Sequence, residues 1–279
     1  MRRVVVGLGM VGGIAVIAVA IFLARIYIVG GSGEASAPIT APTLAVAEAG
    51  TGAGDTPTPE MPEMMEASPT ESAGDPATAA PTPAGGSGGV AQAVAGGERL
   101  LYRISPEESE VRFTLSEVLR GVPTTVIGRT NQVAGDIIVD FGAPARSELG
   151  VIRINARTLQ TDNEFRNRAL RSDILQSARD EFEFAQFAPT ALVGLPEAVA
   201  IGDTVSFQIV GDLTVRDITN QVTFQATVTL AARDRIEGTA STTVTRAAYN
   251  LIIPNVPGVA GVSEDVLLAI DFVARAVEG

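Results

Sequence analysis

The sequence predicts an all-β domain over residues 99–279. Between Val222 and Leu230, apolar and polar residues alternate without interruption, and successive side chains of a strand point to opposite faces of its sheet. The same two-residue period recurs in about eight segments, with patterning typical of antiparallel strands. So many strands in one domain indicate a sandwich or a closed barrel. If the domain is a barrel, its apolar face either packs solid or encloses space for a ligand.

Each predicted strand shows one apolar and one polar or small face. The segments, in chain order, are residues 111–115, 135–140, 151–156, 181–184, 205–215, 222–230, 236–244 and 266–272. In the segment 236–244, small residues such as Gly238 and Ala240 leave one face without bulk. That pattern favours a cavity, or room for a helix packed against the sheet.

One segment, Asp162 to Ala178, breaks the two-residue period and predicts a short helix. Thr161 or Asp162 would serve as its N-cap, since a side-chain oxygen at that position satisfies the first backbone amides. The apolar residues at helical spacing are Phe165, Ala169, Leu170, Ile174 and Leu175. We expect the last three of them to pack across one end of the barrel.

Composition excludes several classes of chemistry. The chain has no His, Cys or Trp, and every basic residue is Arg. Thiolate, imidazole and Lys Schiff-base catalysis are therefore absent, as is a Cys-based metal site. The net charge of −12 provides no basic field to attract nucleic acid. We expect no metal and no cofactor.

Residues 1–30 predict a membrane anchor. Val4 to Ala24 is a run without charges that is long enough to span a bilayer, and Arg2 and Arg3 precede it. This predicts a single-pass protein in the cell membrane, with a cytoplasmic N-terminus and an extracytoplasmic, periplasm-like location for the rest. A cleaved signal peptide is the alternative, but its apolar region is normally shorter.

Residues 31–98 predict a disordered linker rich in Ala, Pro, Thr, Gly and Glu. The segment has no aromatic residue and few apolar residues other than Ala, so it can bury too little surface to offset chain entropy. We expect a spacer that holds the domain away from the bilayer.

Several sequence blocks of residues 99–279 resemble the YceI-like family of exported lipid-binding proteins. The blocks are Arg157 to Asn163 with Leu170 to Asp173, then Phe182 to Phe184, then Gly211 to Thr219 with Val222 and Phe224, and finally Arg246 to Asn250. The resemblance covers roughly residues 100–276, the whole predicted domain. One departure is that Glu108-Ser109 stands where the family often has a His-Ser pair.

The resemblance implies an eight-stranded antiparallel lipocalin-like barrel that holds a long apolar chain, such as a polyisoprenoid or an isoprenoid quinone. It implies a binding protein, and the lack of a Ser-His-Asp set, a phosphate loop or a metal cluster argues against an enzyme. The alternating apolar positions are then candidates for the ligand-binding wall. They are Phe113, Leu115, Ile152, Ile154, Phe182, Phe184, Phe207, Ile209, Leu213, Phe224, Val228, Leu268, Ile270 and Phe272.

Polar candidates are fewer. Arg166, in a pool of Arg residues from Arg153 to Arg171, and Tyr249 with Asn250 are the expected contacts to a lipid headgroup. Pairing with nearby acids or a turn role is the structural alternative. Glu181 and Glu183, on one face of a predicted strand, form the one carboxylate pair suited to glycoside hydrolysis, but that face is predicted to meet solvent.

Two functions remain. In the first, a membrane-tethered barrel carries or stores a long-chain isoprenoid lipid outside the cytoplasm. In the second, a filled barrel acts as a surface or stress-response interaction module without a ligand. A hollow interior of several hundred Å³ would distinguish them. The oligomeric state is left open between a monomer and a homodimer.

Overall fold

The computed structural model describes residues 33–45 and 98–277, all of which belong to one compact unit. The predicted membrane anchor or signal peptide, and the predicted linker from residue 46 to residue 97, lie outside the described residues. Within the described part of the chain, no helix is both long and apolar enough to cross a membrane.

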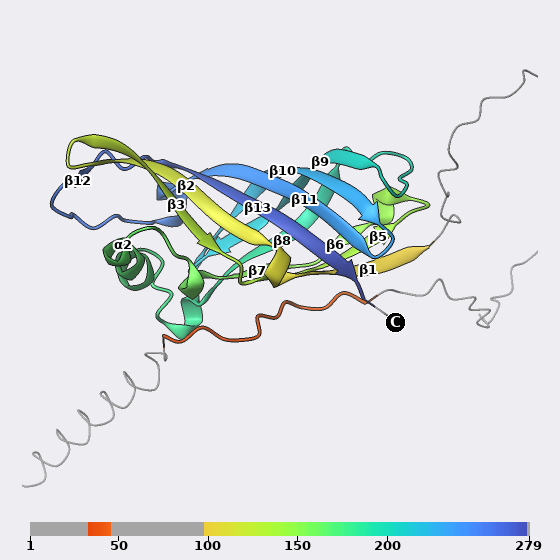
Figure 1. Ribbon diagram of the computed structural model, residues 1–279, viewed down its shortest axis with the longest axis horizontal. Helices are drawn as coiled ribbons and strands as arrows, with labels where there is room; N and C mark the ends of the chain where they lie inside the picture. The colour runs from red at the N-terminus through yellow and green to blue at the C-terminus, as the bar shows by residue number, and fades with distance from the viewer. Residues whose placement is uncertain (1–32, 46–97, 278–279) are drawn as a thin grey trace, which may run out of the picture. The chain divides into compact units, whose positions relative to one another are not determined.

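The strands of the described residues form one antiparallel sheet of thirteen strands (Figure 1). They are β1 (Arg99–Ile104), β2 (Glu110–Leu119), β3 (Val122–Thr130), β4 (Val133–Ala134), β5 (Asp136–Asp140), β6 (Glu148–Leu149), β7 (Ile152–Asn155), β8 (Phe184–Val193), β9 (Thr204–Val215), β10 (Ile218–Ala232), β11 (Arg235–Thr245), β12 (Val259–Ala260) and β13 (Asp265–Ala276). The all-β antiparallel prediction is confirmed, but the strand number differs from the predicted eight.

The sheet is strongly curled. Its strand order is β4-β7-β8-β9-β10-β11-β13-β1-β5-β6, and β13 also pairs with β2, which in turn pairs with β3 and β12. Only Gly135 separates β4 from β5, yet β4 pairs with β7 and β5 pairs with β1, near opposite ends of that order. The inner face therefore surrounds an apolar interior, into which Tyr102, Ile236 and Leu230 are buried.

Five strands, β1, β3, β4, β6 and β12, lie outside the predicted segments, and the last four have local reasons for it. β3 contains Pro123 and Gly128, residues that weaken a strand prediction. Pro123 is tolerated because, among the described strands, β3 pairs with β2 alone. Gly128 is needed because a Cβ at that position would overlap the Phe113 ring. β4, β6 and β12 have only two residues each, too few to show a period.

A second correction concerns the predicted strand 181–184. Asp180–Phe182 forms a 3-10 helix, and β8 begins only at Phe184. Glu183 is buried and its side chain is hydrogen bonded, so it does not face solvent as predicted. The other 3-10 helices are Pro106–Glu108, Pro144–Arg146, Ala156–Thr158 and Ala247–Tyr249.

The short helix is present, although its cap and its end differ from the prediction. α2 (Glu164–Ala169) continues as a π-helical turn, Leu170–Ile174. The N-cap is Asn163, whose side-chain oxygen accepts from the backbone amides of Phe165 and Arg166 at 2.9 and 3.1 Å. Leu170 and Ile174 are buried as expected, whereas Phe165 is exposed.

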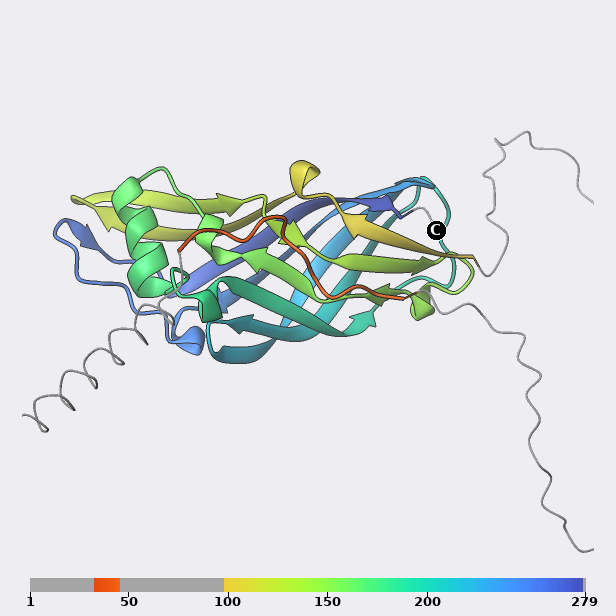
Figure 2. The same ribbon diagram turned by 90° about the horizontal axis from the view of Figure 1, so that it is seen from below.

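Residues 33–45, here named the strap, run in an extended path along the outside of the domain (Figure 2). Ile39 is buried, the Arg153 side chain donates to the Thr40 carbonyl at 3.2 Å, and the Leu44 amide donates to Asp136 at 3.2 Å. The sequence assigns these residues to the disordered linker. The structure gives them an ordered path because charged side chains of the domain supply partners for their backbone.

Candidate functional site

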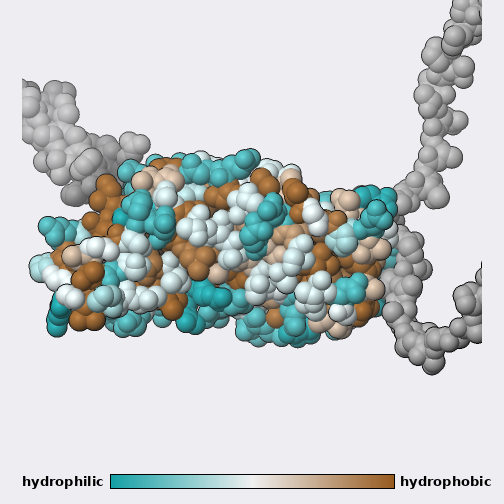
Figure 3. Space-filling model, turned by 90° about the horizontal axis from the view of Figure 1, so that it is seen from above, coloured by the Kyte–Doolittle hydropathy of each residue, from teal (hydrophilic) through white to brown (hydrophobic). Residues whose placement is uncertain are grey.

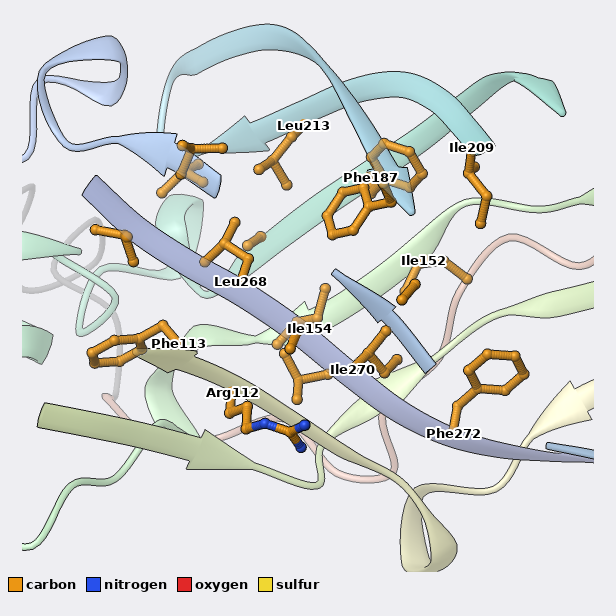
Figure 4. A pocket seen from close by; sticks show the side chains of 18 of the residues that line it. Arg112, Phe113, Ile152, Ile154, Phe187, Ile209, Leu213, Leu268, Ile270 and Phe272 are labelled. Atoms are coloured by element: carbon orange, nitrogen blue, oxygen red, sulfur yellow. The ribbon is translucent and has the colours of Figure 1, made fainter. Parts of the chain in front are cut away.

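The curled sheet encloses a cavity of about 360 Å³. In Figure 4, side chains from several strands, among them Ile152, Phe187, Leu268 and Ile270, point toward one common space. The volume lies within the range of about 300–1,000 Å³ typical of small-molecule sites. The interior is therefore hollow, and the wall around it is overwhelmingly apolar.

Every apolar residue that the sequence predicts for the lining borders this cavity. They are Phe113, Leu115, Ile152, Ile154, Phe182, Phe184, Phe207, Ile209, Leu213, Phe224, Val228, Leu268, Ile270 and Phe272. Their contact with a lipid stays a prediction. The strand period identified those that lie on strands because a curled sheet turns one whole face inward, whereas Phe182 borders the cavity from a 3-10 helix.

Phe187 is a lining residue that the sequence pattern missed. Its ring packs edge-to-face against Phe224, with the ring centroids 5.0 Å apart. The predicted strand ends at Phe184, and Phe187 lies three residues further on, so alternation from Phe184 does not reach it. Ala240 also borders the cavity, as the pattern of small residues suggested. Gly238 has another role, since a Cβ there would press on the β10 backbone.

Tyr249 is the predicted headgroup residue that the cavity best accommodates. It borders the cavity, only 1% of its surface is exposed, and its hydroxyl has no hydrogen-bond partner among the described residues. Burial raises its pKa, and the nearby Asn220 opposes the shift. The amide of Asn220, however, donates to the Ala248 carbonyl at 2.8 Å. A buried hydroxyl without a partner is a donor that a ligand acceptor would satisfy if it reached this part of the wall.

Arg166 also borders the cavity, but acids engage it. Its guanidinium donates to Glu117 at 2.7 Å and to Asp162 at 2.5 Å. Asn250 does not border the cavity. It adopts a left-handed conformation, with φ at 49°, at the end of the 3-10 helix Ala247–Tyr249. The structure therefore brings Tyr249 and Arg166 to one cavity and leaves Asn250 with the turn role.

Arg216 is a polar wall residue that sequence reasoning missed. It lies in the turn between β9 and β10, borders the cavity, and has a buried Nε atom without a hydrogen-bond partner among the described residues. Its nearest acid, Asp217, is 4.0 Å away and largely exposed. Its Nη1 donates to the Ile174 carbonyl at 3.3 Å. No pattern in the sequence distinguishes it from other surface Arg residues.

Arg157 and Glu183 have structural roles away from the cavity. Arg157 donates to the Ser177 carbonyl at 2.5 Å and pairs with Asp180 and Glu183. Glu183 accepts from Asn155 at 2.8 Å and from the Ser36 amide and hydroxyl at 2.6 and 2.9 Å. Burial opposes ionisation of Glu183, but these hydrogen bonds and the Arg157 charge outweigh it and lower its pKa.

Two further features bear on chemistry at the site. Glu181 pairs with Arg179 on the surface, and neither Glu181 nor Glu183 borders the cavity. Glu108, at the departure from the family pattern, also lies outside the cavity wall. Hydrogen bonds from Arg275 and Arg235 lower the pKa of Glu108 to about 2. Among the described residues, no cluster of acidic side chains could hold a metal ion.

The folded part of the chain is similar to known proteins. The model of the YceI-like domain matches residues 102–274, more than half of the chain. BcnA of Burkholderia cenocepacia is 16% identical, with a TM-score of 0.48, over 62% of this chain and 99% of that one. A polyisoprenoid binding domain from Saccharophagus degradans is 15% identical, with a TM-score of 0.48, over 64% and 99%. The YCEI protein of Campylobacter jejuni is 15% identical, with a TM-score of 0.42, over 53% and 82%. No curated protein matches the chain.

Proposed function

Because this chain belongs to the YceI-like family, we propose that its domain binds a long apolar lipid, a polyisoprenoid or an isoprenoid quinone, for carriage or storage. The observation that carries the proposal is the apolar cavity of about 360 Å³ inside the curled sheet. Transfer of a prenyl chain from water into such a space is favoured by about 0.8 kcal/mol for each buried methylene. The cavity can therefore retain a lipid with few polar contacts.

The same cavity weighs against a filled barrel that serves only as an interaction module. In a packed interior, side chains interdigitate and leave few voids larger than a water molecule. Here Phe113, Leu268 and Ile270 border open space. The proposed function is binding and not catalysis.

One end of the cavity supplies the polar contacts for a lipid headgroup. Tyr249 has an unpaired donor, and Arg216 has a buried donor without a strong acidic partner. A quinone carbonyl or a phosphate oxygen would satisfy both groups. Arg166 lies at the same end, although Glu117 and Asp162 already engage it.

Tethering completes the proposal. Residues 4–24 anchor the chain in the cell membrane, with the N-terminus in the cytoplasm and the domain on the other side. The support is the length of the uncharged run and the Arg residues that precede it.

Ala240→Phe tests the cavity directly. Ala240 borders the cavity, so a phenyl group there fills part of the space that the lipid needs. Thr239→Phe is the matched control, because Thr239 is the adjacent residue of β11 and is exposed. The measurement is native mass spectrometry of the full chain, with organic-solvent extraction and identification of the lipid.

We expect prenyl lipid in the wild-type protein and in Thr239→Phe, and loss of most of it in Ala240→Phe. Circular dichroism checks that all three proteins fold. A folded wild-type protein that contains no lipid and takes up no prenyl quinone would overturn the proposal. Equal lipid content in the two variants would show that the lipid binds outside this cavity.

A further inference from the structure

Exposed apolar side chains gather at the end of the domain that carries α2. Among the large hydrophobic residues that the structure describes, the three most exposed are Phe165 at 80%, Ile252 at 71% and Val122 at 62%. Phe165 lies on α2, Val122 at the turn between β2 and β3, and Ile252 in the loop that precedes β12. Val256 of the same loop is also exposed. Large apolar side chains in water at neighbouring positions indicate a contact surface.

These three segments lie together. The Arg120 amide, in the β2–β3 turn, donates to the Gly258 carbonyl at 2.6 Å. β12 pairs with β2, and Arg166 of α2 donates to Glu117 of β2 at 2.7 Å. Figure 1 shows α2, β12 and the β2–β3 turn at one end of the sheet, and brown side chains appear at that end in Figure 3. We name this end the α2 end.

The α2 end also carries several of the polar residues of the cavity wall, whereas Ser147 and Glu148 border the cavity near β6. Tyr249 and Arg216 border the cavity there, and so do Leu170 and Ile174 of the turn that continues α2. A lipid whose headgroup meets Tyr249 would therefore have its polar part toward this end and its chain deeper in the sheet.

The strap determines where the chain leaves the domain toward its N-terminus. Arg157 donates to the Glu34 carbonyl at 2.5 Å, and Ser36 bonds Glu183. Figures 1 and 2 both show the strap beginning near α2 and running to the other end, where Leu44 meets Asp136. Residues 25–32 are all that separate the start of the strap from the predicted anchor. Eight residues span at most about 28 Å.

We propose that the α2 end docks on the bilayer surface, with Val122, Phe165 and Ile252 inserted among the lipid headgroups and upper acyl chains. This inference rests on the proposed tether and lipid binding. Docking places the polar end of the cavity against the bilayer, so a prenyl chain passes between membrane and cavity with little exposure to water. The strap also revises the role expected of the linker, because the short stretch 25–32 now sets the distance between anchor and domain.

A bilayer is the partner that fits the α2 end, because the α2 end carries charges of both signs. Arg120 and Arg168 are exposed at the α2 end, and so are Asp162, Glu164 and Asp173. Insertion of apolar side chains therefore carries the interaction, and a neutral lipid surface should suffice. If this surface bound a protein partner instead, its apolar residues would stay exposed to water on vesicles that contain lipid alone.

The absence of Cys makes the test direct. Val122→Cys, Phe165→Cys and Ile252→Cys each carry one environment-sensitive fluorophore, in the full chain reconstituted into phosphatidylcholine vesicles. Val193→Cys and Ile201→Cys are matched controls, since both residues are exposed and apolar, but Val193 ends β8 and Ile201 lies in the β8–β9 loop at the opposite end. The measurements are vesicle co-flotation, emission wavelength, quenching by brominated phosphatidylcholine, and prenyl-lipid content by extraction.

We expect a blue shift and strong quenching at the three α2-end sites, and neither change at the two control sites. Protein that co-floats and contains lipid but shows no quenching at the α2 end would overturn docking and leave the lipid site intact. Equal quenching at both ends would also overturn it. Protein that fails to co-float would refute the tether and this inference together, whereas lipid content reports on the cavity separately.

Discussion

Tyr249 places a polar group in an apolar wall. Its hydroxyl is buried and lacks a hydrogen-bond partner among the described residues, and such a group costs about 1–3 kcal/mol when it is left unsatisfied. The cost is recovered if a ligand presents an acceptor. The residue thus reports on ligand chemistry: a quinone or phosphate head gains from Tyr249, whereas a pure hydrocarbon does not.

Tyr249→Phe separates the cost of the unpaired hydroxyl in the free protein from its contribution to ligand binding. Without ligand, we expect the free energy of unfolding to stay equal or to rise by about 1 kcal/mol, because an unpaired donor is removed. With a prenyl quinone, we expect weaker binding than in the wild type, by about 1 kcal/mol or roughly fivefold. Urea denaturation and a fluorescence titration measure the two effects. Unchanged quinone affinity would remove Tyr249 from the headgroup site.

At the residue scale, the sequence pattern predicted the apolar residues of the cavity wall better than the polar ones. Phe113, Ile154 and Phe272 follow from alternation alone, because a strand has only two faces. Arg216 does not, because its role depends on a turn that carries it to the cavity rim beside Ile174. The N-cap of α2 is Asn163 and not Thr161 or Asp162. All three residue types are favoured N-caps, so the sequence alone does not choose between them.

At the scale of elements, a buried carboxylate, Glu183, holds the start of the strap. Glu183 binds Ser36 through two hydrogen bonds and pairs with Arg157, which itself holds the Glu34 carbonyl. Its pKa is lowered in the folded state from an ordinary value of 4.5. Ionised Glu183 therefore stabilises the docked strap above pH 4.5, and that contribution is lost as the pH falls through the lowered pKa.

Acidification and Glu183→Gln should both release the strap. We expect the protection of the Ser36 and Leu44 amides, relative to intrinsic exchange at the same pH, to fall as the pH drops through the lowered pKa of Glu183, and to be lower in Glu183→Gln at neutral pH. The loss should be about 1–2 kcal/mol of local stability, because a charged acceptor is replaced by a neutral one. Glu181→Gln is the control, since Glu181 pairs with Arg179 on the surface. Exchange that is independent of both changes would contradict this account of the strap.

At the scale of the whole domain, a hollow sheet gives up part of its own packing. The cavity of about 360 Å³ leaves wall side chains without partners, and cavities in protein interiors reduce stability. A bound chain restores those contacts. Ligand binding to the folded state alone raises stability in proportion to the logarithm of ligand concentration over the dissociation constant.

Removal of bound lipid should therefore lower the melting temperature. We expect the extracted and refolded protein to melt several degrees below the protein as purified, in line with about 1–2 kcal/mol for a domain of this size. Addition of a prenyl quinone should restore the original value. Circular dichroism during heating measures both. Equal melting temperatures with and without lipid would argue that no ligand occupies the cavity.

The sequence by itself determined the class of this protein: an antiparallel β domain, the inward set of apolar side chains and one short helix. These features are local, because the period of two and the period of a helix are written into neighbouring residues. Only the tertiary structure decided that the wall encloses space, that Arg216 and Tyr249 share it, and that the strap lies on the domain. Each of these depends on contacts between residues distant in the chain, such as Ser36 with Glu183, which no local pattern encodes.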